Sequence, residues 1–156
     1  MKKISIIFCL ISFLGQAQSN SKQTLTSKET VQSFFTNFGN SNLEGIYSLF
    51  SDNTKIISIN KKGIEGVNLY GTFNGQEGLK TFLTTLSNTF DTQSFQVDHI
   101  IGEGDVAFAS GSFVHKVKAT DKLFESDWAL MCIVKQGKIV EYHFFEDSAS
   151  FVLANK

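Results

Sequence analysis

The chain has 156 residues, of which 42% are hydrophobic and 19% are charged, and its formal net charge is −1. This composition is typical of one globular domain, and it excludes a disordered tail, a collagen-like repeat and a disulfide-rich miniprotein. All 14 basic residues are lysine and the net charge is slightly negative, so we expect neither arginine clamps on phosphate nor binding to nucleic acid.

The N-terminal segment has the pattern of an export signal. Two lysines at positions 2 and 3 precede an apolar run over 4–15, and Gly15 and Ala17 are small residues of the kind that a signal peptidase recognises. We therefore predict a signal peptide over 1–17 and a periplasmic or secreted protein. An uncleaved anchor is the alternative, although the apolar run is short for a permanent membrane anchor.

Cleavage after Ala17 would leave Cys132 as the only cysteine, which excludes an internal disulfide bond in the exported chain. Cys132 lies in an apolar, strand-like stretch, where cysteine usually behaves as a small hydrophobic residue. We expect it to fill the core, because a thiol nucleophile would need a base and none lies nearby in the sequence.

Three amphipathic helices are predicted after a polar, flexible leader over 18–26. The first begins at an N-cap on Ser27 and ends at Gly39, with apolar residues at helical spacing between them. Asn42 is predicted to cap a second helix that ends at Phe50, and a third helix is predicted over 76–90. Each helix has an apolar face, so the three are expected to pack against a common core.

The rest of the chain favours strands. One strand is predicted over 54–60, a glycine-containing loop or short irregular strand over 61–75, and longer strands over 93–102, 105–118, 122–135 and 138–147. Short joints between the last four indicate antiparallel hairpins. The order predicts an α+β fold, a cone-shaped roll whose three N-terminal helices pack on a strongly curved, mainly antiparallel sheet. The domain would span 27–150, with a C-terminal tail over 151–156.

Several strings resemble the nuclear-transport-factor-2-like superfamily, in particular its SnoaL-like and ketosteroid-isomerase-like branch. They are VQSFF at 31–35, NLEGIYSLFSDN at 42–53, GQEGLKTF at 75–82, GDVA at 104–107, WA at 128–129, and the stretch 137–147. The resemblance covers about 27–150 and implies the same helix-and-sheet fold with a pocket between its layers. This fold hosts isomerases, cyclases, hydrolases and binding proteins, so the resemblance does not decide the function.

The resemblance also indicates where the ketosteroid isomerase residues would fall. The tyrosine of that enzyme corresponds to Phe34, its base to Ser58, and its late-strand acid to Leu130 or Ala129. Proton abstraction needs a base and donors to the enolate oxygen, and these side chains supply neither. We therefore expect a chain that lacks the ketosteroid isomerase catalytic residues.

Limonene-epoxide-hydrolase-like relatives give the same result. Their charged residues correspond to Ser110, Ser112 and Phe144. The loss of both sets of charged groups favours a binding protein, or a chemistry that other pocket residues carry.

Sixteen phenylalanines are enough to line a pocket for a small apolar ligand. Strand alternation, with the register taken from the resemblance, predicts which side chains face it. The predicted pocket consists of Phe34, Phe38, Tyr47, Phe50 and Phe82 from helices, Ser58, Ser110, Ser112, Trp128, Leu130, Tyr142 and Phe144 from strands, and Tyr70 at its mouth.

Glu146, His143 and Tyr142 are the weak candidates for catalysis. An inward, desolvated Glu146 would have a raised pKa and could act as a general acid or base, whereas a solvated strand end would leave it inert, and we expect the solvated end. If Tyr142 faces the pocket, His143 faces away. The opposite register would make His143 and Asp147 a pocket dyad, and this alternative stays open.

No metal and no cofactor are predicted. His99 and His115 lie on different predicted strands without zinc-ligand spacing, although sequence alone leaves a three-histidine site open.

The outward side of the last strands is predicted to carry Ala129, Met131, Ile133, Phe145 and Phe113. A bare apolar sheet face needs a cover, so we expect a homodimer formed through this outer face.

Three functions are compatible with the sequence. Our prediction is an exported module that binds a small hydrophobic or aromatic ligand. The alternatives are a SnoaL-like isomerase, cyclase or hydratase that uses Glu146 or His143 with Tyr142, Ser110 or Ser112, and a non-catalytic dimer whose pocket is filled by its own phenylalanines. A ligand site would have a volume of about 300 Å³ or more, and a strongly raised carboxyl pKa would favour the enzyme.

Overall fold

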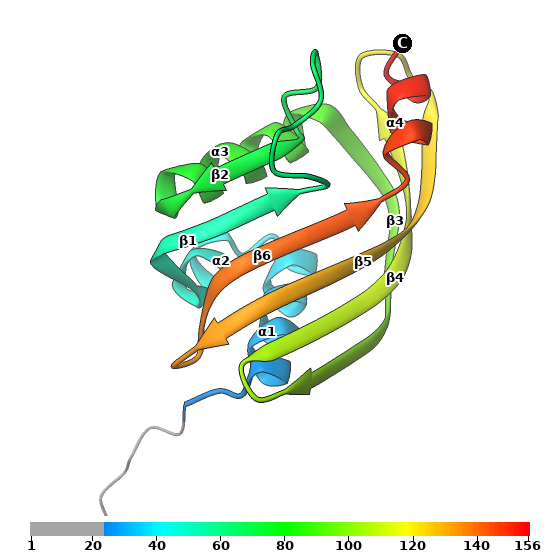
Figure 1. Ribbon diagram of the computed structural model, residues 1–156. Coiled ribbons are helices and arrows are strands. Elements are labelled where there is room, and N and C mark those ends of the chain that lie inside the picture. Colours follow the sequence, from blue (N-terminus) through cyan, green and yellow to red (C-terminus); the bar gives the residue numbers. More distant parts are fainter. Residues whose placement is uncertain (1–23) are drawn as a thin grey trace, which may run out of the picture.

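The structure is a computed structural model that describes residues 24–156 (Figure 1). The predicted signal peptide over 1–17 and most of the predicted leader lie outside the described residues. Within 24–156, no helix is both long and apolar enough to cross a membrane.

A single six-stranded sheet forms one layer of the fold. Its strands are β1 (Phe50–Ser58), β2 (Gly71–Asn74), β3 (Phe90–Glu103), β4 (Val106–Val117), β5 (Leu123–Lys135) and β6 (Lys138–Glu146), in the order β2-β1-β6-β5-β4-β3. The four last strands pair antiparallel with their sequence neighbours, whereas β1 lies parallel to β6. The sheet is therefore mixed.

Helices form the second layer. They are α1 (Ser27–Gly39), α2 (Leu43–Leu49), α3 (Gly75–Thr89) and, after the last strand, α4 (Ser148–Ala154). In Figure 1, α1 and α2 lie behind the sheet, and α4 stands at one end of it. The predicted α+β order of helices and strands is confirmed. The strong curvature that we expected of the sheet is not confirmed.

Local side-chain caps fix the helix starts. Asn42 caps α2 as predicted, and its Oδ1 accepts the Gly45 N–H at 3.1 Å. The predicted cap of α1 is wrong by one residue, because Thr26 and Glu29 form a reciprocal capping box there. Ser27 is instead the first residue of α1, and its hydroxyl donates to the carbonyl of Val106.

The inward and outward faces of β4 are the reverse of those predicted. Ala109 pairs with Leu130 and Gly111 with Trp128, so these residues share the buried face of the sheet. Ser110 and Ser112 consequently point to the outer face. The register taken from the resemblance is therefore wrong by one residue on β4. Hydrophobicity does not reveal the error, because the inward positions carry small residues while the large Phe108 points outward and is 49% exposed.

The same shift reverses one further prediction. Phe113, expected on the outer face, is buried on the inner one and stacks on His115.

Close packing on this inner face explains a glycine at position 111. A Cβ there would lie 1.9 Å from the carbonyl oxygen of Gln96 and 2.6 Å from Cζ2 of Trp128. Glycine therefore allows β3 and the indole ring to approach β4 from either side.

The C-terminal segment belongs to the domain instead of forming the predicted tail. Asp147 caps α4, accepting the N–H groups of Ala149 and Ser150. Phe151 is buried, with its ring centroid 5.4 Å from those of Tyr70 and Phe124. α4 thus extends the core at one end of the sheet.

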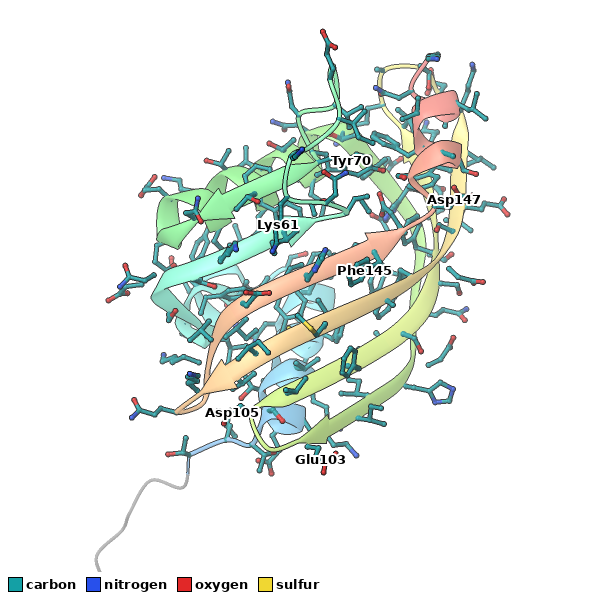
Figure 2. All side chains as sticks on the ribbon, in the orientation of Figure 1. Lys61, Tyr70, Glu103, Asp105, Phe145 and Asp147 are labelled. Atoms are coloured by element: carbon teal, nitrogen blue, oxygen red, sulfur yellow. The ribbon has the colours of Figure 1, made fainter. Side chains whose placement is uncertain are left out.

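The outer face carries exposed apolar side chains. Ile101, Phe108 and Phe145 are 65%, 49% and 41% exposed, and Figure 2 labels Phe145 on the side of the sheet opposite the helices. The predicted homodimer would cover this face, and it stays a prediction.

Candidate functional site

The space between the helices and the sheet contains a small inner cavity. Its volume is about 40 Å³, and α1, α3 and strands from both halves of the sheet line it. Its walls are mainly aromatic and leucine side chains. Four polar residues interrupt them, namely Ser58, His115, Tyr142 and Glu146.

A wider groove adjoins this cavity. It has a volume of about 760 Å³ and runs between α1, α2, α3 and β3. The side chains that line both spaces are Phe35, Phe38, Leu83, Leu86 and Phe95. The groove and the inner cavity therefore lie next to each other, with these side chains between them.

Glu146 is the last residue of β6 and points toward the inner cavity. It pairs with the inward-facing Trp128, and its Oε1 accepts the Tyr70 hydroxyl at 2.7 Å. Burial raises its pKa to about 7, an effect that the Tyr70 hydrogen bond opposes and the nearby Asp147 charge reinforces. Our expectation of a solvated, inert Glu146 is therefore wrong. Near neutral pH this carboxyl can both accept and donate a proton.

Tyr70 reaches Glu146 from a distant part of the sequence. It lies at the end of the loop between β1 and β2 (Figure 2), and its ring is buried against Phe151. Burial and the negative charge of Glu146 raise the pKa of Tyr70 far above its usual value. Tyr70 therefore keeps its hydroxyl proton near neutral pH and donates it in a hydrogen bond to Glu146.

His115 is the second titratable group on the cavity wall. It lies on the inward face of β4, and its Nδ1 has no hydrogen-bond partner in the described part of the chain. Burial lowers its pKa to about 4, so the imidazole is neutral at neutral pH. A buried, unpaired polar atom of this kind costs about 1–3 kcal/mol.

Tyr142 and Cys132 lie beside each other on the inward face of paired strands. Tyr142 faces the cavity, and burial raises its pKa, with added contributions from Cys132 and Glu146. Burial also raises the pKa of the Cys132 thiol, so it stays protonated and unreactive. This is consistent with Cys132 as a core residue.

His143 points to the outer face, so the alternative register with a His143–Asp147 dyad is not adopted. Its Nε2 lies 3.2 Å from the carbonyl oxygen of Ile59, and its ring packs on Phe145 with centroids 4.0 Å apart. Asp147 caps α4, as described above. Within 24–156, no three His, Cys, Asp or Glu side chains are grouped to hold a metal ion.

The structure separates the predicted pocket residues into three groups. The inner cavity is lined by Phe34, Phe38, Ser58, Phe82, Tyr142 and Phe144. Tyr70 does not line the cavity, but its hydroxyl donates to Glu146, which does. Tyr47, Phe50, Trp128 and Leu130 lie in or against the core around it, and Ser110 and Ser112 lie on the opposite face.

Sequence reasoning did not place His115, Phe95 or Leu86 at the site. A correct register for β4 would have placed His115, since it shares a face with Gly111 and Phe113. Phe95 follows a register shift in β3, which simple alternation cannot anticipate.

The two-layer arrangement, with helices over a mixed sheet and a site between them, defines an NTF2-like, ketosteroid-isomerase-like fold. A family model of the SnoaL-like domain matches residues 31–142, and the chain belongs to this family. Among curated proteins, none matches the chain significantly.

Solved structures share the fold at low sequence identity. An NTF2-like protein from Burkholderia xenovorans LB400 is 20% identical, with 86% of this chain and 100% of that chain covered and a TM-score of 0.73. TerC, co-crystallised with polyporic acid, is 18% identical (83% and 97% covered, TM-score 0.72). A protein with a ketosteroid-isomerase-like fold from Catenulispora acidiphila DSM 44928, in complex with trimethylamine, is 12% identical (81% and 92% covered, TM-score 0.65).

Proposed function

We propose that this SnoaL-like protein binds a small, largely apolar organic molecule between its helices and its sheet. The observation that carries the proposal is a wide apolar groove that lies next to an inner cavity, whose wall carries the partly buried carboxyl of Glu146. Apolar walls supply affinity and a few polar groups supply orientation in most small-molecule sites.

The two volumes suggest how the ligand lies. Small-molecule sites usually measure about 300–1,000 Å³, which the groove satisfies with about 760 Å³. The inner cavity, at about 40 Å³, has room only for small substituents. The body of the ligand therefore occupies the groove, and its polar part enters the cavity toward Glu146. The inner cavity, which several of the predicted pocket residues line, is smaller than a ligand site, so only the groove argues against a pocket filled by its own phenylalanines.

Binding can be tested with calorimetry on a panel of naphthalene, 2-naphthol and polyporic acid, the compound with which TerC was co-crystallised. Trp128 is the only tryptophan and stacks on Phe95 of the groove at 5.1 Å between centroids, so its fluorescence should change in parallel. Leu86→Glu places a charge in the groove and should weaken binding at least tenfold. Leu123→Glu, at a residue that is 57% exposed away from the groove, is the matched control.

The panel also defines what would refute ligand binding. If none of the three compounds produces saturable heat or a fluorescence change, the proposed site does not bind small apolar molecules. Equal weakening by Leu86→Glu and Leu123→Glu would place the binding elsewhere.

A second function, catalysis of proton transfer, is favoured by the pKa of about 7 at Glu146. In this role the Glu146 carboxylate takes a proton from a carbon next to a carbonyl group, which leaves an enolate, and the resulting carboxylic acid returns a proton to that carbon. The raised pKa suits this task because both protonation states are populated near neutral pH.

Deuterium exchange tests this chemistry directly. The protein should accelerate incorporation of deuterium next to the carbonyl of 2-tetralone in D2O, followed by proton NMR. Glu146→Gln should lower the catalysed rate by about 100-fold or more. Glu125→Gln changes an exposed carboxyl on β5 in the same way and should leave the rate unchanged. If Glu146→Gln keeps the full rate, Glu146 is not the base.

A further inference from the structure

His115 is a buried polar residue whose hydrogen-bonding capacity the described residues do not satisfy. Its side chain is 5% exposed and lines the inner cavity, and its Nδ1 lacks a hydrogen-bond partner in the part of the chain that the structure describes. Stacking on Phe90 and Phe113 holds the ring, at 4.7 and 4.1 Å between centroids. A phenylalanine would make the same stacks without burying a nitrogen, so packing alone does not account for a histidine here.

His115 and Glu146 face the cavity from different places. Glu146 ends β6 and pairs with Trp128 on β5, which pairs with Gly111 on β4. His115 lies four residues further along β4 on the same face. The two polar groups are thus separated by one intervening strand and by four residues along the sheet, so they mark two distinct points on the wall.

We propose that His115 binds a hydroxyl group of the ligand, and that the preferred ligand is an aromatic molecule with two hydroxyl groups, one for His115 and one for Glu146. The proposal rests on the ligand site proposed above. A hydroxyl group suits both positions because it can donate to a ring nitrogen or a carboxylate, and can accept from an N–H or a carboxylic acid.

The surroundings of His115 argue against other partners. The imidazole is uncharged at neutral pH, because burial lowers its pKa to about 4, and so it has no charge with which to attract an anion. Within 24–156 it belongs to no cluster of metal-binding side chains. A neutral hydrogen-bonding group that is carried by an aromatic ring fits both the nitrogen and the aromatic residues around it.

Calorimetry with 2-naphthol and with the 2,3-, 2,6- and 2,7-dihydroxynaphthalenes tests the proposal. The wild-type protein should bind the best dihydroxy isomer about tenfold more tightly than 2-naphthol, because one good hydrogen bond contributes about that factor. His115→Phe keeps the stacking and should bind both compounds equally well. Thr54→Val is the matched control, because it removes another buried, unpaired polar atom that does not line the cavity, and it should keep the tenfold preference.

A measurement on the wild-type protein makes the test independent of how well the variant folds. In protein labelled with ¹⁵N-histidine, the Nδ1 resonance of His115 should shift when the preferred dihydroxy isomer binds and should stay in place with 2-naphthol. Neutral ring nitrogens respond strongly to hydrogen bonding, whereas a purely structural His115 would respond alike to both compounds.

The outcomes separate this proposal from the one on which it rests. If 2-naphthol binds and no dihydroxy isomer binds more tightly, or if His115→Phe keeps the preference, the role of His115 is refuted while the ligand site stands. If no naphthalene compound binds at all, both proposals fail.

Discussion

The two faces of the sheet are built from the same strands, yet they differ in almost every physical respect. On the inner face, Trp128, Tyr142 and Phe113 pack into one aromatic core with the helices. On the outer face, Phe108 and Phe145 are about half exposed. Because successive side chains of a strand point to opposite sides, one residue of register decides whether a group is core or surface. Every polar group of the candidate site lies on the inner side, so the comparison predicts where mutations matter.

The largest contrast should be in stability. Phe124 is 1% exposed on the inner face, and Phe124→Ala should lower the free energy of unfolding by about 3–5 kcal/mol, because it leaves a cavity among closely packed rings. Phe108→Ala removes the same side chain from the outer face and should cost about 1 kcal/mol or less in the monomer. Urea denaturation at low protein concentration measures both. Equal losses would show that the two faces are buried alike.

The next contrast is between two inward groups with opposite pH effects. Glu146 has a pKa of about 7 instead of 4.5, so its contribution to stability is complete below pH 4.5 and is lost as the pH rises through 7. His115 has a pKa of about 4 instead of 6.5, so its contribution is complete above pH 6.5 and is lost as the pH falls through 4. Each group changes the free energy of unfolding by about 3 kcal/mol, because each unit of difference between its pKa in the folded protein and its ordinary pKa corresponds to about 1.4 kcal/mol.

Between pH 4.5 and 6.5 the two effects should largely cancel, and single variants should reveal them. Relative to the wild type, Glu146→Gln should gain stability as the pH rises from 4.5 to 7, because the unfavourable ionisation is removed. His115→Phe should lose its relative advantage over the range from 4 to 6.5. Denaturation midpoints measured from pH 4 to 8 provide the test. If the pH profile of a variant parallels that of the wild type, the replaced side chain does not have the shifted pKa that its burial predicts.

Much of the difference between the two faces of the sheet could be predicted from the sequence. The errors have identifiable physical causes. Apolar spacing gave the order of helices and strands, and on β6 alternation correctly placed Tyr142 inward and His143 outward. On β4 the register taken from the resemblance was wrong by one residue, and apolar alternation could not correct it, because Ala109 and Gly111 are too small to mark the inner face while Phe108 points outward.

The environment of Glu146 could not be predicted from local sequence patterns, for a different reason. The Tyr70 hydroxyl that binds it comes from a loop 76 residues earlier in the chain. No periodicity reports such a contact, so the sequence could name Glu146 as a candidate but could not show that it is buried. Tertiary packing decides whether a carboxyl at a strand end is solvated or desolvated.

The outer face of the sheet should mediate the association of two copies of the chain. If a second copy covers Phe145 and Phe108, Phe145→Asp should weaken the dimer by about 2 kcal/mol or more, since it would place a charge in an apolar contact. Analytical ultracentrifugation should then show a dimer for the wild type and a monomer for the variant at micromolar concentration. Asp127→Asn, at another outward position, serves as a mild control. A monomeric wild type would refute the dimer.

The smallest expected effect concerns the hydrogen bond between the loop and the sheet. Tyr70→Phe removes the donor to Glu146 and should cost about 1–2 kcal/mol above pH 7, where Glu146 is ionised, and less below pH 5, where it is protonated. Because this bond lowers the pKa of Glu146, its loss should move the titration to a pH above 7, which ¹³C NMR of the labelled carboxyl can follow. Tyr47→Phe, outside the cavity, should leave the titration unchanged. An unaltered titration in Tyr70→Phe would mean that burial alone sets the behaviour of Glu146, and that the loop contributes nothing to the chemistry of the inner face.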